Sequence, residues 1–192
     1  SLISFLFFFF FFSCSRNHQD LHSFPTRRSS DLQYHPSALL LFIGDGPLKE
    51  QYQSVVHEKS LDDKITFTGS IPNIVEYLSI ADVGVFPSES EGLPLVLMEM
   101  MAVELPVVAS KIPSCCDLIE ENVNGILYET YDYKDLANKI LSVLCDNELK
   151  KKLGEQAKLL VCNHYSIENM INRHNILYQK LLLKQNFTDA YN

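Results

Sequence analysis

Two glutamates, Glu91 and Glu99, stand eight residues apart in the stretch FPSESEGLPLVLMEMMA, residues 86–102. One precedes a helix expected to begin at Pro94, and the other falls in the second turn of that helix. Gly92 lets the backbone pass close to a ligand, and a helix start favours a phosphate through its free N–H groups and its dipole. A carboxylate accepts hydrogen bonds from vicinal hydroxyls, so two carboxylates flanking a phosphate site predict sugars on both sides of a diphosphate. The alternative is a surface loop with ordinary acidic residues near a helix start.

Short apolar runs bounded by Gly and Pro predict the strands that must position this loop. They cover residues 38–43, 65–67, 83–86, 106–109 and 126–128. Helices are expected to begin near Pro47, Pro72 and Pro94, and the chain is helical throughout after Tyr133, with Ser166 capping a last helix to about residue 184. Strands that alternate with helices predict an α/β fold with a Rossmann-like, doubly wound parallel sheet, whose ligands bind at the carboxyl ends of the strands.

The segment EGLPLVLME, preceded by ADVGVFPS and followed by LPVVAS, resembles the retaining glycosyltransferases of family 4, the glycosyl transferases group 1. The similarity is to their C-terminal, donor-binding domain in the GT-B fold. PSALLLFIGDGPLKEQY, KITFTGSIPNIVEYLSIAD, NVNGILYE and residues 135–164 resemble the same domain in the same order. The resemblance covers about residues 36–183, and we therefore divide the chain into a leader (1–32), a partial donor-binding domain (33–186) and a tail (187–192).

The resemblance implies transfer of a sugar from a nucleotide-diphosphate sugar to a glycan or lipid-linked acceptor, with retention at the anomeric carbon. It places Glu91 at the donor sugar, as the catalytic position, and Glu99 on the ribose hydroxyls. The remaining donor-binding positions it implies are Gly44, Gly69, Ile71, Ser88, Gly92, Leu93, Leu95 and Val96, of which Gly69 and Ile71 lie near the base. No metal cofactor is implied, because basic side chains and a helix terminus neutralise the leaving diphosphate.

Several parts of the family pattern are not found. Nothing before Pro36 matches the first strand and helix of this domain or the Arg and Lys that follow that strand, and no acceptor-binding N-terminal domain is present. The missing strand belongs in the middle of the sheet, so we expect a gap there and a chain that is inactive by itself. Glu104 replaces a usual Gly, and Pro113 to Asp117 replace a Gly-Gly loop near the donor, which leaves sugar specificity open.

Residues 1–32 differ from the remainder of the chain. Phe7 to Phe12 form an unbroken run, as a translated poly-T tract would, and HSFPTRRSSDL at 22–32 matches a translated sequencing adapter. The apolar run is about half of the roughly 20 residues that a membrane-spanning helix needs. A secretory signal would have a basic start, which is absent here, and Cys14 leaves lipidation as an alternative. We therefore interpret this leader as an artefact fused to a genuine reading frame.

Charge and cysteine content limit the classes of partner. The chain has 16 basic and 24 acidic side chains, a net charge of −8, and residues 33–192 alone carry −9. This balance argues against nucleic acid and against a polybasic membrane-surface protein. Five cysteines without paired short spacings indicate a reduced, cytoplasmic protein. The family resemblance implies that the full-length enzyme can associate peripherally with the inner face of the membrane.

Other candidate sites are weaker. Gly44-Asp45-Gly46 opens like a dinucleotide fingerprint, but Lys49 occupies the third glycine position. Cys115 and Cys116 are adjacent, and adjacent cysteines seldom bind one metal ion together. The three histidines on expected helices, His57, His164 and His174, are interpreted as surface or core-edge residues. A non-catalytic nucleotide-sugar-binding or interaction domain with the same fold remains the alternative function.

Overall fold

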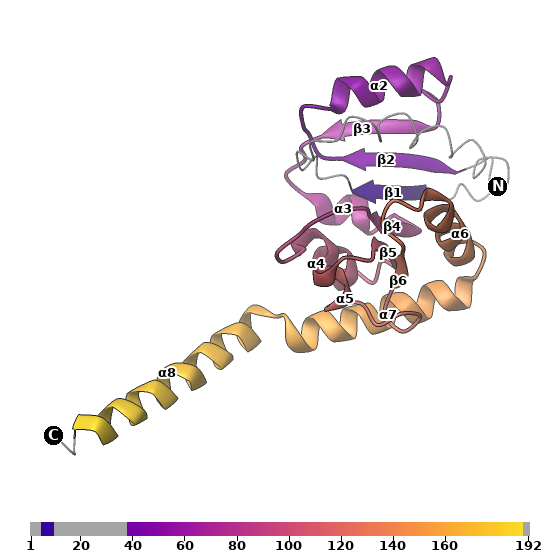
Figure 1. Cartoon of the computed structure of the whole chain (residues 1–192). Coiled ribbons are helices and arrows are strands. Elements are labelled where there is room, and N and C mark those ends of the chain that lie inside the picture. Colours follow the sequence, from indigo (N-terminus) through magenta and orange to yellow (C-terminus); the bar gives the residue numbers. More distant parts are fainter. Residues whose placement is uncertain (1–4, 10–37, 190–192) are drawn as a thin grey trace.

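A computed structural model describes residues 5–9 and 38–189 of the chain, with side chains for residues 38–182. Six strands form one sheet in which every neighbouring pair is parallel, in the order β3-β2-β1-β4-β5-β6. This is the doubly wound order expected for a Rossmann-like fold. Figure 1 shows β3, β2 and β1 side by side as arrows, with α2 above β3. The strands are β1 (Phe5–Phe9), β2 (Leu39–Ile43), β3 (Ile65–Gly69), β4 (Val83–Phe86), β5 (Val107–Ser110) and β6 (Ile126–Tyr128).

Helices connect and cover the strands as the Gly and Pro punctuation predicted. They are α2 (Lys49–Glu58), α3 (Ile74–Leu78), α4 (Leu95–Ala102), α5 (Pro113–Cys116), α6 (Tyr133–Leu144), α7 (Asn147–His164) and α8 (Ile167–Asp189). The Ser166 hydroxyl accepts a hydrogen bond from the Asn169 N–H at 3.3 Å, which confirms the expected cap of the last helix. Helix α5 was not predicted, because a single turn is too short to show a periodic pattern.

The expected gap in the middle of the sheet does not exist. Residues of the leader fill it as β1, which pairs with β2 along Phe5–Phe9 and with β4 from Leu6 to Phe8. Our expectation of a missing first strand was wrong because we interpreted the poly-Phe run as an artefact that matches no part of the domain. A central strand of a parallel sheet needs only a continuous apolar run of β-favouring residues, and Phe is one of these. Our predictions about the first helix, the adapter-like stretch and Cys14 concern residues 10–37, which lie outside the described residues.

Two apolar clusters pack on opposite faces of the sheet. On β5, Val107 and Ala109 belong to the first cluster and Val108 to the second, as the alternation of side chains along a strand requires. Helices α4, α5 and the second half of α7 contribute to the first cluster, and α2 and α6 to the second. Helix α7 also supplies Leu153 to the second cluster, so it bridges both. The sheet therefore has buried faces on both sides, which leaves its edges and strand ends for function.

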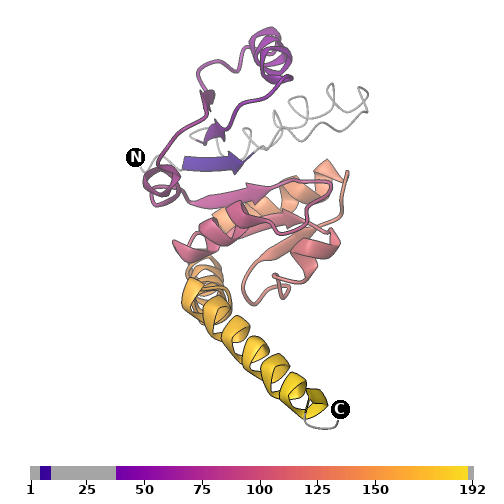
Figure 2. The same cartoon turned by 90° about the vertical axis from the view of Figure 1, so that its left-hand side faces the viewer.

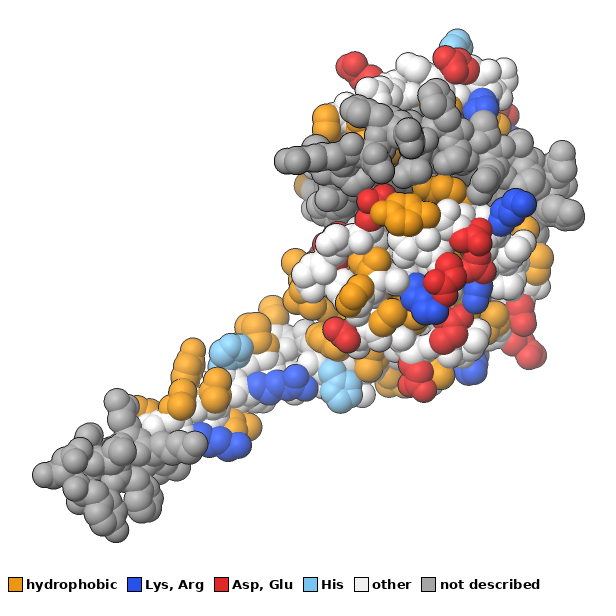
Figure 3. Space-filling model, viewed as in Figure 1, with side chains coloured by type: hydrophobic (Ala, Val, Ile, Leu, Met, Phe, Trp, Pro, Cys, Tyr) orange, Lys and Arg blue, Asp and Glu red, His pale blue; other side chains and the backbone are white. Residues whose placement is uncertain are grey.

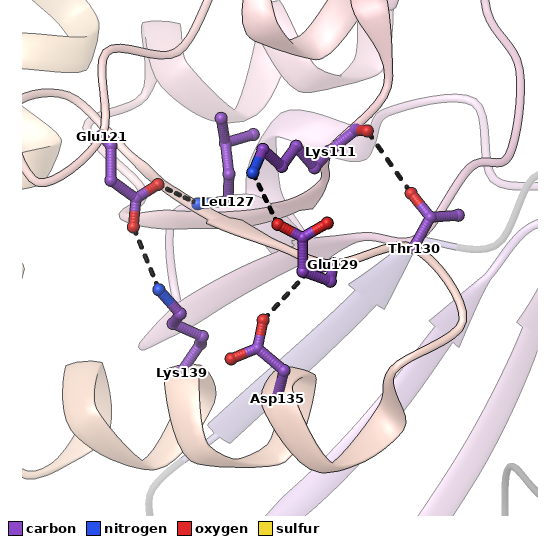
Figure 4. Close-up of polar contacts among 7 residues, drawn as sticks. All are labelled: Lys111, Glu121, Leu127, Glu129, Thr130, Asp135 and Lys139. Atoms are coloured by element: carbon purple, nitrogen blue, oxygen red, sulfur yellow. Dashed lines mark hydrogen bonds and ion pairs between the residues drawn. The ribbon is translucent and has the colours of Figure 1, made fainter.

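Acidic side chains close the outer edge of β6 (Figure 4). Lys111 donates its N–H to the Tyr128 carbonyl at 2.9 Å, so Tyr128 faces β5 and its neighbours Leu127 and Glu129 face outward. The Leu127 N–H donates to Glu121 Oε2 at 2.7 Å, and the Glu129 N–H donates to Asp135 Oδ2 at 2.9 Å. Carboxylates thus take the place of a neighbouring strand, and they remove two donors that would otherwise be open to edge-to-edge pairing.

Replacing Asp135 by Ala tests this closure. We expect the free energy of unfolding to fall by about 1 kcal/mol, because the Glu129 N–H loses its partner. Asp135→Asn keeps an oxygen acceptor of the same reach and is expected to lose clearly less. Urea unfolding followed by circular dichroism measures both. Equal losses for the two variants would show that the side-chain charge, and not the acceptor, stabilises this edge.

Helix α8 extends away from the body in both cartoon views (Figures 1 and 2). Apolar side chains lie exposed along it, and Figure 3 shows them as an orange row. The large exposed members are Ile167, Met170, Ile171, Ile176, Leu177, Tyr178, Leu181 and Leu182. None of the helices among the described residues combines the length and apolar character needed to cross a bilayer.

Candidate functional site

The strand order places one loop at the point where the sheet reverses direction. The chain builds outward from β1 to β2 and β3, then crosses back to β4 on the other side of β1. In such sheets ligands bind outside the carboxyl ends of the strands at this switch point. The loop after β4, residues 87–94, leaves the sheet there and leads into α4. The topology therefore points to the Glu91 loop as the candidate site.

Glu91 and Glu99 differ in their surroundings. Glu91 is half-buried, and its Oε1 accepts a hydrogen bond from the Ser88 hydroxyl at 2.8 Å, so the side chain is oriented within the loop. Glu99 is exposed on α4, one turn after the helix begins at Leu95. The two carboxylates thus stand on either side of the helix start, as the sequence predicted, with one held by a neighbour and the other open to solvent.

The start of α4 has no side-chain cap. Pro94 occupies the N-cap position, where no side chain of the described residues accepts from the first N–H groups of the helix. The Leu95 N–H donates to the Leu93 carbonyl at 2.9 Å, so this amide is engaged within the loop. Among the amides that the resemblance assigned to the donor, Gly92, Leu93 and Val96 show no such bond. An uncapped helix start with its dipole suits an anion.

Two glycines join the neighbouring loops at the same edge of the sheet. The Gly44 N–H, after β2, donates to the Gly69 carbonyl at the end of β3 at 3.0 Å. Gly69 has a φ of +69°, a backbone conformation that favours glycine. A Cβ on it would lie 3.2 Å from Lys49 Nζ. Gly44 and Gly69 are thus brought together, with the partly buried Ile71 two residues further on, while the ligand contacts predicted for them stay predictions.

Ser110 and Cys115 lie close to the Glu91 loop. Ser110, the last residue of β5, is fully buried, and its hydroxyl donates to the Ser88 carbonyl. Burial, together with the nearby Cys116 and Glu91, raises the pKa of the Cys115 thiol to about 12. Cys115 therefore stays a neutral thiol at physiological pH. Tyr128 is also buried, and burial raises the pKa of its hydroxyl well above the ordinary value.

The sequence did not single out Ser110. The signal was present, because LPVVAS ends in a hydroxyl after three buried apolar residues, at the carboxyl end of a strand. What the sequence lacked was the pairing of β4 with β5, which places residues 88 and 110 next to each other.

The described residues give no support to the weaker candidate sites. No group of three or more His, Cys, Asp or Glu side chains within the described residues is arranged to hold a metal ion. Cys115 is buried whereas Cys116 is exposed, so the two thiols have different surroundings. Lys49 forms an ion pair with Asp45 at 3.6 Å, and His57 lies 3.3 Å from Asp62 at an exposed position.

Comparison with known families defines the class of protein. The chain has the doubly wound, Rossmann-like architecture of GT-B domains, and it belongs to the glycosyl transferases group 1 family, whose model matches residues 22–160. The match begins within the leader segment 1–32. The resemblance drawn from the motifs is confirmed at the level of family and fold.

Relatives and solved structures agree with this assignment. The chain is 29% identical over 145 residues to N-acetyl-alpha-D-glucosaminyl L-malate synthase of Bacillus anthracis. The aligned region covers 76% of this chain and 38% of that protein. The C-terminal domain of the group 1 protein LpcC from Francisella tularensis superposes with a TM-score of 0.72 and 24% identity, over 85% of this chain and 87% of that one. A TarM variant of Staphylococcus aureus, crystallised with UDP among its ligands, superposes with a TM-score of 0.79 and 23% identity, over 91% of this chain and 35% of that one. The chain thus spans well under half the length of the curated relatives that it matches.

Proposed function

We propose that the chain forms the donor-binding part of a retaining glycosyltransferase that takes its sugar from a nucleotide-diphosphate sugar. The observation that carries the proposal is the position of the Glu91 loop, which joins β4 to an uncapped α4 at the switch point of the sheet. An anionic diphosphate fits that helix start. Family membership supports the transfer of a glycosyl group, and the TarM structure with UDP supports a nucleotide diphosphate as the bound part of the donor.

The two carboxylates have separate tasks in this proposal. Glu91 accepts hydrogen bonds from the donor sugar close to the reacting carbon, and its half-buried, oriented side chain suits a fixed contact. Glu99 accepts from the two ribose hydroxyls, and its exposed carboxylate on α4 is free to do so. The N–H groups of Gly92, Leu93 and Val96 face the diphosphate, with Ser88 beside the sugar and Gly44, Gly69 and Ile71 toward the nucleotide. Leu95 lines the helix start through its side chain.

No metal ion takes part in this proposal, and the helix start neutralises part of the diphosphate charge. The acceptor, a glycan or a lipid-linked sugar, binds a part of the longer enzyme outside this chain. The chain alone is then expected to bind donor without transferring its sugar. Cytoplasmic location and peripheral membrane association of the longer enzyme belong to the same proposal.

Isothermal titration of the chain with UDP, GDP, ADP, the three matching monophosphates and UDP-N-acetylglucosamine, each with and without EDTA, tests the proposal. We expect at least one nucleoside diphosphate to bind, with the matching monophosphate at least ten-fold weaker because it lacks the second phosphate. Circular dichroism in the same buffer establishes that the chain is folded. A folded chain that binds none of these ligands would contradict donor binding, and binding that EDTA abolishes would contradict metal independence.

A further inference from the structure

A chain of hydrogen bonds runs from the interior of the sheet to the candidate catalytic glutamate. The Ser110 hydroxyl on β5 donates to the Ser88 carbonyl, and the Ser88 hydroxyl donates to Glu91 Oε1 at 2.8 Å. Ser110 is 0% exposed, whereas Ser88 and Glu91 are only partly buried. This series of hydrogen bonds therefore begins at a fully buried side chain of β5 and ends at the Glu91 side chain in the loop of the candidate site.

The acceptor fixes the direction of the hydrogen bond from Ser110, because the Ser88 carbonyl oxygen can only accept. The single hydroxyl proton of Ser110 is thus engaged by the Ser88 carbonyl. A buried hydroxyl in an apolar strand is costly unless it is bonded, so this arrangement holds the Ser110 side chain in one orientation.

The loop has little else to hold it. The backbone of residues 87–92 makes no hydrogen bond to another described backbone group outside the strand pairing. Among the described residues, the hydrogen bond from Ser110 to Ser88 is thus the polar contact that joins this segment to the sheet. Because it fixes the Ser88 backbone, it also fixes the point from which the Ser88 hydroxyl reaches Glu91.

We propose that Ser110 is a positioning residue of the donor site, which acts through Ser88 to hold the Glu91 carboxylate against the donor sugar. This inference rests on the proposed function, because it takes Glu91 to contact the sugar and not the nucleotide. It adds a buried residue of the neighbouring strand that touches no ligand itself. A loss of Ser110 then affects the sugar moiety selectively.

Titration of Ser110→Ala with UDP and with UDP-N-acetylglucosamine tests the inference on the full chain. We expect affinity for UDP-N-acetylglucosamine to fall about five-fold, while affinity for UDP stays within two-fold of the unchanged chain. Ser88→Ala keeps the carbonyl but removes the hydroxyl that reaches Glu91, so it is expected to give the same selective loss. The double variant should lose about five-fold as well, and not the product of the two single losses, because both changes break one chain.

The possible outcomes separate the two proposals. If the unchanged chain is folded and binds neither ligand, the proposed function fails with these probes and the role of Ser110 fails with it. If the unchanged chain binds both ligands and Ser110→Ala weakens both equally, Ser110 has a structural role only. Unchanged affinities, or losses that multiply in the double variant, would equally overturn the positioning role. Should Ser110→Ala unfold the chain, Ser88→Ala decides: without a selective loss of the sugar ligand, the inference is wrong.

Discussion

Gly154→Ala is expected to lower the free energy of unfolding by about 3 kcal/mol, at the upper end of what overpacking usually costs. A Cβ at Gly154 of α7 would lie 2.1 Å from the carbonyl oxygen of Glu104 and 3.0 Å from its carbonyl carbon. These are backbone atoms of the turn after α4, so no flexible side chain can move aside. The added methyl group must therefore push α7 away from α4, along the interface that holds Ala157 and Val161 in the core.

Two other Gly→Ala substitutions supply matched controls. A Cβ at Gly84 on β4 would lie 2.7 Å from Met100 Sδ and 2.9 Å from Leu105 Cδ2, which are ends of flexible side chains, so a loss of about 1–2 kcal/mol is expected. A Cβ at Gly92 meets nothing within 4 Å, so stability should change by less than about 0.5 kcal/mol. Urea unfolding of the three variants measures the series. A Gly154 variant as stable as the Gly92 variant would show that the two helices separate without cost.

The same turn explains one departure from the family pattern. Glu104 has a φ of +64°, the left-handed region in which glycine is favoured and other residues are uncommon. The backbone conformation at this position is therefore one that the usual Gly adopts more readily than Glu does. In this chain the Lys158 ammonium contacts the Glu104 carboxylate at 2.7 Å, and this contact between α7 and the turn has no counterpart when Gly is present.

Apart from the single turn α5, the strands and helices of residues 38–189 could be predicted because their signals are local. Apolar runs stop at Gly44, Gly69 and Pro87, and helices follow prolines, so strand and helix boundaries are marked in the sequence itself. The position of β1 could not be predicted in this way. A run of identical apolar residues has no periodic pattern, and only the vacancy between β2 and β4 identifies it as a strand.

The residues of the candidate site also differ in whether local sequence signals or tertiary contacts reveal them. Glu91, Gly92 and Glu99 share one loop and one helix, so their spacing along the chain already reports their proximity. Ser110 lies 22 residues from Ser88, and the contact arises only because β4 and β5 pair in parallel. Residues that meet only in the tertiary structure have no characteristic spacing in a single sequence. For this reason the sequence did not reveal that the buried Ser110 contacts the loop.

Glu99→Gln is expected to weaken the binding of UDP ten-fold or more. Two ribose hydroxyls donate to the carboxylate in the proposed function, and hydrogen bonds to a charged group contribute roughly 1.5–3 kcal/mol each, whereas ten-fold corresponds to about 1.4 kcal/mol. Glu and Gln have similar helix propensities, and Glu99 is exposed on α4, so the fold should be unaffected. Isothermal titration measures the change.

A control variant and a control ligand assign the loss to the ribose contact. Removing a carboxylate near a diphosphate reduces charge repulsion, so a general electrostatic effect would tighten binding. Glu89→Gln, at an exposed position of the same loop with no assigned ligand contact, reports that effect and is expected to leave UDP affinity equal or slightly higher. The analogue 2′,3′-dideoxy-UDP lacks the two hydroxyls, so Glu99→Gln should not weaken its binding. An equal loss for UDP and for the dideoxy analogue would mean that Glu99 acts elsewhere than on the ribose.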